Sequence, residues 1–248
     1  MFLKERLARE GDVLNGVLGT IPSAVSAQAV AAAGADFLLV DREHAPIGRE
    51  ALHAMIAATA GTACGPLVRV PAIDEAEVKL ALDAGAEGIS FPMVRSAADV
   101  ERCVALLRYP PEGTRGWGPF VAHARHGTSP AQYATAVGPH ISCWAQIETL
   151  EAVQDIEAIV RVPGLDVVVL APFDLSMALG VEGRFDAPSF VEAVEAVERA
   201  AVGAGLPMCG VALDGRRAAD LVARGYRALL RGIDVFMLAD AVAALRDG

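Results

Sequence analysis

Short runs of apolar residues alternate with longer amphipathic segments along most of the chain. Most of these runs are apolar at nearly every position, which is typical of parallel strands covered on both faces. The hydrophobic pattern therefore predicts a parallel sheet enclosed by helices. Its buried strands are expected at Val13–Leu18, Asp36–Val40, Pro66–Val70, Gly88–Phe91, Ile141–Ile147, Leu165–Leu170, Met208–Leu213 and Tyr226–Leu230.

The amphipathic segments between the strands predict helices, several of which end in a glycine directly before the next strand, as short helix-to-strand connections do. Repeated β/α units in 248 residues favour one closed (β/α)8 TIM barrel over residues 1–248. An open doubly wound sheet is the alternative, but the sequence lacks a Gly-x-Gly-x-x-Gly phosphate turn after the first strand. The helices are expected at Ser23–Ala33, Ala51–Thr59, Asp74–Ala84, Ala97–Leu107, Ala131–Ala136, Leu150–Val160, Ser189–Ala204, Gly215–Ala223 and Val235–Leu245.

The net charge of −10 argues against a nucleic acid or an anionic membrane surface as a partner. No apolar stretch reaches the roughly 18 residues that a membrane span requires. The first ten residues include acidic ones, unlike a signal peptide. The four cysteines show no short paired spacing, which favours buried thiols in a reducing compartment. We therefore expect a cytoplasmic protein.

Polar side chains follow the predicted strands at their carboxyl ends, where barrel enzymes place their chemistry. Asp41 and His44 follow the second strand, and Arg69 lies near the end of the third. Glu148 follows the fifth strand and Asp174 the sixth. Two carboxylates on neighbouring strands are typical ligands of a hard divalent cation such as Mg²⁺ or Mn²⁺. Helix capping is the alternative role for each carboxylate, because both precede predicted helices.

Arg69 has a planar fork that suits a carboxylate or an enolate oxygen, although a structural ion pair in the barrel is the alternative. His44 is three residues from Asp41, which gives its ring a candidate orienting carboxylate and a role in proton transfer. The chain has only two lysines, Lys4 and Lys79, and neither follows a strand as a Schiff-base lysine would.

The connection from Tyr109 to His140 is long for a compact domain, and such loops usually carry function or contact a partner. His123 and His126 in this loop, together with Arg115 and Arg125, are placed by this reasoning at the rim of the site.

Six segments together resemble the metal-dependent (class II) pyruvate aldolases, which include the hydroxy-oxo-heptanedioate, dehydro-deoxy-glucarate and rhamnonate aldolases. The resemblance runs through nearly the whole chain, and the segments occur in the family's order. They are Leu38-Leu39-Val40-Asp41 with Glu43-His44-Ala45-Pro46, Val68-Arg69-Val70-Pro71, Phe91-Pro92-Met93-Val94, Arg108 to Gly116, Gln146-Ile147-Glu148-Thr149, and Pro172-Phe173-Asp174-Leu175-Ser176.

The resemblance implies that Glu148 and Asp174 bind a divalent metal ion (Mg²⁺, Mn²⁺ or Co²⁺). It also implies that Arg69 holds the keto or enolate oxygen of pyruvate and that His44 with Asp41 moves protons through a water molecule. Gln146 and the backbone of Phe173 and Asp174 would hold the pyruvate carboxylate. The implied reaction is reversible cleavage of a 4-hydroxy-2-oxo acid to pyruvate, or a close 2-oxo acid such as hydroxypyruvate, and an aldehyde.

The family further implies a hexamer, a trimer of dimers in which the helix at Val235–Leu245 packs on a neighbour. Arg42 departs from the family, where a small residue is common, and Phe173 replaces the alanine of some members; these differences leave the aldehyde open. The alternatives are a CoA-ester lyase of the malyl or citramalyl type, a phosphoenolpyruvate mutase-like enzyme and a non-catalytic metabolite-binding barrel.

Overall fold

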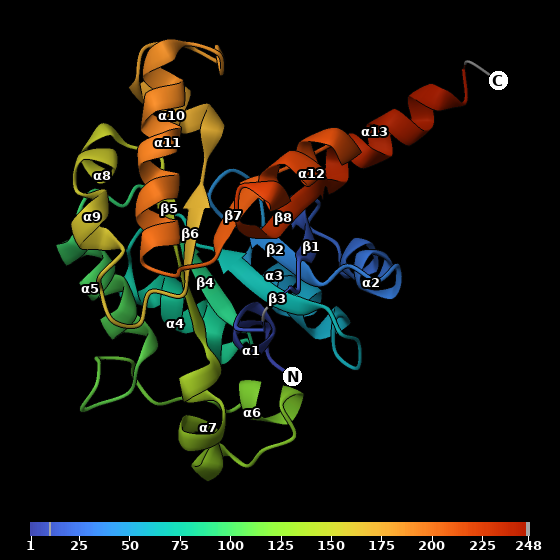
Figure 1. Ribbon diagram of the computed structural model, residues 1–248. Coiled ribbons are helices and arrows are strands. Elements are labelled where there is room, and N and C mark those ends of the chain that lie inside the picture. Colours follow the sequence, from blue (N-terminus) through green and yellow to red (C-terminus); the bar gives the residue numbers. More distant parts are fainter. Residues whose placement is uncertain (10, 247–248) are drawn as a thin grey trace.

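The computed structural model describes residues 1–9 and 11–246 and shows a closed barrel of parallel strands (Figure 1). The strands pair in the order β1-β2-β3-β4-β5-β6-β7-β8, and β8 closes the barrel on β1. The predicted TIM-barrel fold is therefore confirmed. The strands are β1 Leu14–Gly19, β2 Phe37–Asp41, β3 Gly65–Arg69, β4 Gly88–Phe91, β5 Ser142–Ile147, β6 Val167–Leu170, β7 Met208–Val211 and β8 Tyr226–Ile233.

Alternate residues of each strand face the barrel interior and the surrounding helices. Trp144 of β5 packs inside the barrel with Phe37 of β2 and Leu67 of β3, in a cluster separate from the larger core under the helices. Since side chains alternate along a strand, Gln146 faces the same interior one step nearer the carboxyl end. Both faces of the strands are buried, which explains why the strand sequences read as continuous apolar runs.

The helices begin and end close to their predicted positions, with one exception. The segment predicted as one helix at Leu150–Val160 forms two, because Asp155 leaves the helical conformation between them and its carboxylate accepts the backbone N–H of Ala97, 2.7 Å away. The helices are α2 Ala24–Ala32, α3 Arg49–Ala58, α4 Glu75–Asp83, α5 Ala97–Leu107, α8 Leu150–Gln154, α9 Ile156–Ile159, α10 Pro172–Ala178, α11 Pro188–Gly203, α12 Gly215–Ala223 and α13 Asp234–Ala244.

A short helix that the sequence pattern did not predict, α1 (Leu3–Leu7), closes the amino-terminal end of the barrel. Leu3 and Leu7 are buried in the interior cluster. Gly65 at the start of β3 lets α1 approach, because a Cβ atom there would lie 2.4 Å from Leu3 Cγ. With this end plugged, the barrel interior opens at the carboxyl ends of the strands.

The long connection between α5 and β5 lies near the plugged end (Figure 1) and contains α6 (Ala122–Arg125) and α7 (Pro130–Ala136). The ring of Phe2 stacks on His140 and lies 5.3 Å from that of His126. Arg125 reaches Glu87, which precedes β4 at the same end. The interpretation of His126 and Arg125 as rim residues of the site is therefore wrong. Their role is to anchor the loop and α1.

The last helix, α13, leads away from the barrel (Figure 1). Its first residue, Asp234, ties it to the loop after β1 by accepting the backbone N–H groups of Thr20 and Ile21 at 2.8 and 3.0 Å. Phe236 and Leu238 are more than half exposed. Within residues 1–9 and 11–246, no helix combines the length and the apolar character needed to cross a bilayer.

Candidate active site

Arg69 and Asp41 meet at the carboxyl ends of β3 and β2, where they lie opposite each other in the strand register. Arg69 Nε donates to Asp41 Oδ1 at 2.9 Å, and Arg69 Nη2 donates to Asp41 Oδ2 at 2.8 Å. Both side chains are largely buried. A two-point ion pair of this kind fixes the plane of the guanidinium group at the carboxyl ends of the strands.

Among the described residues, Asp41 contacts the backbone of His44 rather than its ring, so the expected proton relay of His44 with Asp41 through a water molecule stays a prediction. Asp41 Oδ1 accepts the backbone N–H groups of Glu43 and His44, at 3.0 and 3.3 Å, in addition to Arg69. The His44 ring is 62% exposed, and its Nε2 lies 3.6 Å from Glu43 Oε2. Asp41 therefore holds the turn and Arg69, while the carboxylate next to the ring belongs to Glu43.

Glu43 is a site residue that the sequence reasoning did not select. Its Oε2 lies 3.3 Å from Arg69 Nε, so it forms a second carboxylate contact to that guanidinium group. Burial raises the pKa of Glu43, an effect that the charges of Arg69 and His44 oppose. In the sequence, Glu43 could have been selected by its position in the turn after the second strand, between Asp41 and His44.

Glu148 follows β5 and is almost fully buried at the barrel mouth. Its Oε1 accepts the backbone N–H of Met93 at 2.5 Å. Burial raises the pKa of Glu148 to about 7, and the negative charges of Glu43 and Asp174 add to the rise, while Met93 and Arg69 oppose it. Glu148 does not cap α8, because Thr149 is the N-cap and accepts the Ala152 N–H. The capping alternative is therefore wrong for this residue.

Asp174 is an exposed residue in the first turn of α10, and it does not cap that helix either, because the N-cap is Ala171. Its carboxylate and that of Glu148 line one hollow of about 370 Å³. The remaining lining residues of this hollow come from the loop after β4 and from α8 and α10: Met93, Arg95, Thr149, Leu150, Glu151 and Ala178.

The two carboxylates in this hollow fit a hard divalent cation. Oxygen is the donor that Mg²⁺ and Mn²⁺ prefer, and Glu148 keeps its second oxygen free of the Met93 contact. In the described part of the chain, no third His, Cys, Asp or Glu completes a metal-binding cluster with them. Such a pair can supply two ligands and leaves the other positions of a six-coordinate ion to water and substrate.

Gln146 lies inside the barrel below Glu148 and is nearly fully buried. Its Nε2 has no hydrogen-bond partner among the described residues. A buried amide donor without a partner is costly, so this group is available for a ligand that enters the mouth.

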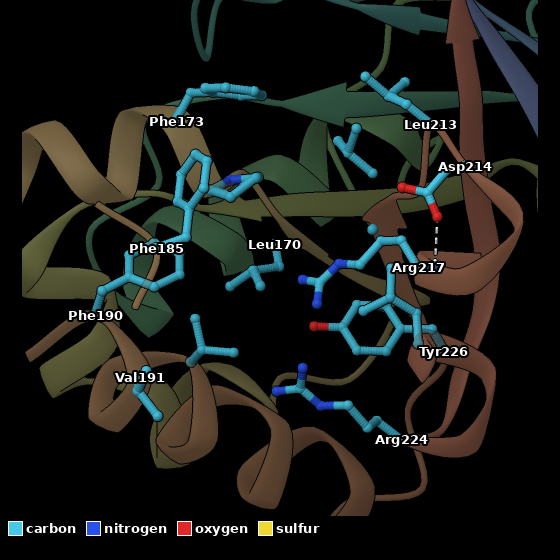
Figure 2. A pocket seen from close by; sticks show the side chains of 15 residues that line it. Leu170, Phe173, Phe185, Phe190, Val191, Leu213, Asp214, Arg217, Arg224 and Tyr226 are labelled. Atoms are coloured by element: carbon cyan, nitrogen blue, oxygen red, sulfur yellow. Dashed lines mark hydrogen bonds between the residues drawn. The ribbon is translucent and has the colours of Figure 1, made fainter. Parts of the chain in front are cut away.

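The Phe173 side chain points away from this hollow, into a separate cavity of about 460 Å³ between α11 and α12 (Figure 2). There its ring packs edge-on against Phe185. At the opposite wall, Arg224 and Tyr226 are both hydrogen-bonded to Glu198. Only the backbone of Phe173 is therefore placed to serve the site, and α10 separates the two cavities.

Neither lysine reaches the barrel mouth. Lys4 on α1 pairs with Asp166 at 3.0 Å, at the plugged end of the barrel. Lys79 on α4 pairs with Glu75 of the same helix at 3.3 Å. The site therefore lacks an amine for a covalent imine.

Comparison with known proteins places the chain in a family. Residues 20–241 match the model of the HpcH/HpaI aldolase/citrate lyase family. The chain is 33% identical to a hydroxypyruvate/pyruvate aldolase of Roseovarius nubinhibens, over 92% of this chain and 89% of that protein. It is 37% identical to a 4-hydroxy-2-oxovalerate aldolase of Novosphingobium aromaticivorans, over 93% and 88%.

Among solved structures, an HpcH/HpaI aldolase from Desulfitobacterium hafniense superposes with a TM-score of 0.91 and is 33% identical, covering 100% of this chain and 96% of that one. The similarity in sequence and the similarity in structure both extend over nearly the whole barrel. The chain belongs to the HpcH/HpaI aldolase/citrate lyase family.

Proposed function

We propose that this chain is a divalent-metal-dependent aldolase. It cleaves a 4-hydroxy-2-oxo acid reversibly to an aldehyde and pyruvate, or a close 2-oxo acid such as hydroxypyruvate. The observation that carries this proposal is that two carboxylates, Glu148 and Asp174, line one hollow at the mouth of the barrel. The charge of Arg69 acts on Glu148 and opposes the rise of its pKa. The aldolase names of relatives at 33% and 37% identity support the reaction class.

Glu148 and Asp174 would hold the metal ion. When bound, this ion supplies positive charge that polarises the keto group of the substrate and lowers the cost of forming the enolate. Arg69 adds a fixed positive charge, because Asp41 holds its guanidinium group by two hydrogen bonds. The negative charge that develops on the enolate oxygen is thus met by groups that are already oriented.

The 2-oxo acid carboxylate would be held by the side-chain amide of Gln146 and the backbone N–H groups of Phe173 and Asp174. Gln146 Nε2 is buried and unpartnered within the described residues. The backbone N–H groups of Phe173 and Asp174 lie in the first turn of α10, where helical amides have no intrahelical partner. These donors are uncharged and short in reach, which suits a carboxylate placed against the barrel wall.

His44 would move the proton of the C4 hydroxyl, directly or through a water molecule. Its side chain is 62% exposed at the barrel mouth, so the ring can reach a substrate that lies over the hollow. During cleavage the ring accepts the hydroxyl proton as the C3–C4 bond breaks, and in the synthetic direction it returns that proton to the aldehyde oxygen.

The protein is proposed to be cytoplasmic and to act as a homo-oligomer, a hexamer by its resemblance. All four cysteines are free and buried, which suits a reducing compartment. The helix α13 carries exposed Phe236, Leu238 and Val242, a surface that a neighbouring subunit would cover.

Turnover of pyruvate with a panel of aldehydes tests the proposed function. Product should form with Mn²⁺, Co²⁺ or Mg²⁺, disappear in excess chelator and return when the metal ion is restored. Glu148→Gln should abolish product at every metal concentration, whereas Glu50→Gln, a change to an exposed carboxylate on α3, should leave turnover intact. Full activity in chelator would rule out the metal-dependent mechanism.

A further inference from the structure

The cavity between α11 and α12 takes no part in the aldol reaction proposed above, and α10 separates it from the hollow that Glu148 and Asp174 line. We propose that this cavity is a second ligand site, for a small aromatic carboxylate, and that its occupancy affects the hollow through α10. The binding site is independent of the aldolase function, whereas the coupling rests on the proposed role of Asp174 as a metal ligand.

The cavity has the size and the lining of a small-molecule site. Its volume of about 460 Å³ lies within the roughly 300–1,000 Å³ that such sites occupy. Phe173, Phe185 and Phe190 form one wall, with the centroids of neighbouring rings 5.4 and 5.3 Å apart (Figure 2). Phe173 and Phe185 are 58% and 41% exposed, and a cluster of exposed aromatic rings marks a surface that binds a ligand or a partner. This wall suits an aromatic body.

Two arginines, Arg217 and Arg224, turn their guanidinium groups into the cavity opposite these rings (Figure 2). Glu198 of α11 holds Arg224 by two hydrogen bonds, from Nε at 3.1 Å and from Nη2 at 2.7 Å. The same carboxylate accepts the hydroxyl group of Tyr226 at 2.8 Å. Arg224 is therefore oriented before a ligand arrives, which lowers the cost of binding one.

Both guanidinium groups keep donors for a ligand. Arg217 Nη1 donates to Asp220 at 3.1 Å, while its Nε and Nη2 make no hydrogen bond to another described residue. Arg224 Nη1 lies 3.6 Å from the Asp220 carboxylate, beyond hydrogen-bond distance. The lining also includes Asp214, whose carboxylate is engaged as the N-cap of α12, where it accepts the Arg217 backbone N–H. A carboxylate is the ligand group that fits converging arginine donors.

A neighbouring copy of this chain is the alternative occupant of the cavity. Its exposed apolar helix face, with Phe236, Leu238 and Val242 of α13, would take water from the two arginines without offering acceptors in return. Removing water from unpaired guanidinium donors is costly. The free donors of Arg217 and Arg224 therefore favour a small anionic molecule over an apolar helix.

Phe173 connects the cavity to the hollow. Its ring belongs to the cavity wall, and the next residue, Asp174, lines the hollow. Both residues lie in the first turn of α10, so a ligand packed on the Phe173 ring restrains the segment that carries Asp174. Restraint of this segment should strengthen metal binding, because the two carboxylates are then held in one hollow before the ion arrives.

Calorimetric titration of the full-length protein with 3-phenylpropionate, in chelator, tests the site without any metal ion. Binding should be saturable and at least about 10-fold tighter than that of 3-phenylpropionamide or propionate, because each of these lacks one of the two recognised groups. Equal affinity for the acid and the amide, or the absence of saturable binding, would overturn the proposal.

Variants of the lining locate the bound probe. Arg217→Gln should weaken binding about 10-fold, and Val191→Trp, which fills the cavity from α11, should abolish it. Arg216→Gln and Val202→Trp are the matched controls, because both residues are exposed and lie outside this cavity, and both should leave binding unchanged. If Val191→Trp alters the oligomeric state in sedimentation and leaves probe binding intact, the cavity belongs to a neighbouring subunit and the proposal is overturned.

Titration with Mn²⁺, followed by the electron paramagnetic resonance of the free ion, tests the coupling. Saturating 3-phenylpropionate should raise the Mn²⁺ affinity of the wild-type protein about twofold or more and that of Val191→Trp not at all. Unchanged affinity in the wild type, or an equal rise in Val191→Trp, would overturn the coupling. A lack of Mn²⁺ binding with and without the probe would contradict the proposed metal site, and the titration in chelator still decides whether the cavity binds a carboxylate.

Discussion

The backbone N–H of Met93 donates to the buried carboxylate of Glu148 at 2.5 Å. Met93 follows β4, and its φ angle of 54° lies in the left-handed region of backbone conformation, which residues other than glycine rarely adopt. Backbone strain of this kind is concentrated at functional sites, where surrounding contacts hold it in place. Here the strained residue aims an amide at one of the two carboxylates that line the hollow.

Substitutions at Met93 should separate the strain from the side chain. Met93→Val should destabilise the protein by about 1 to 2 kcal/mol, because a β-branched side chain is poorly tolerated at positive φ. Met93→Gly should be close to neutral, since relief of strain offsets the greater freedom of the unfolded chain. Denaturant unfolding of the three proteins measures the difference. Equal stability of the valine and glycine variants would show that the left-handed conformation carries no cost.

Glu148→Gln should stabilise the metal-free protein at pH 8 and leave its stability nearly unchanged at pH 4.5. Burial raises the pKa of Glu148 from 4.5 to about 7. Below pH 4.5 the group is protonated in both folded and unfolded states, so it costs little. Above pH 7 it is ionised in both states, and its burial as an anion costs up to about 3 kcal/mol.

Denaturant unfolding in chelator at the two pH values measures this effect, with Glu50→Gln as the control for a change in net charge. An equal stability change from Glu148→Gln at both pH values would contradict the raised pKa of Glu148.

Arg69→Lys should be nearly as damaging as Arg69→Ala, with kcat/KM lowered by about 100-fold or more in both. A lysine ammonium cannot reproduce the two parallel hydrogen bonds to Asp41 and still face the substrate. The loss should appear in kcat, because the enolate carries the charge that Arg69 meets. Arg49→Lys, at the start of α3, is the control. A loss confined to KM would contradict this role and show that Arg69 only binds the substrate.

Borohydride treatment in the presence of pyruvate should leave activity unchanged. Lys4 lies at the plugged end of the barrel with Asp166, and Lys79 is paired with Glu75 on the outside of α4. Neither amine can reach a 2-oxo acid in the hollow. Mass spectrometry of the treated protein provides the check, and a pyruvyl adduct on either lysine would contradict a mechanism without an imine.

The barrel was predictable because its strands are buried on both faces and are apolar in sequence. The polar residues Asp41, Arg69 and Glu148 stood out against those runs. The contact of Glu43 with Arg69 was not predictable, because it depends on how the side chains of one turn are arranged. The role of Met93 was not predictable either, because its backbone N–H makes the contact with Glu148 and the residue type does not indicate such a contact. The α1 plug has only two buried leucines, too few for a clear periodic pattern.

Exchange of the methyl protons of pyruvate in D₂O tests the central claim most directly, because enolate formation needs no aldehyde. With Mg²⁺ present, the wild-type protein should deplete the pyruvate methyl NMR signal faster than Mg²⁺ alone. Glu148→Gln and Arg69→Ala should reduce the rate about 100-fold or more, because each removes a group that stabilises the enolate. Wild-type exchange no faster than the metal-only control would contradict the assignment of this site to 2-oxo acid enolisation.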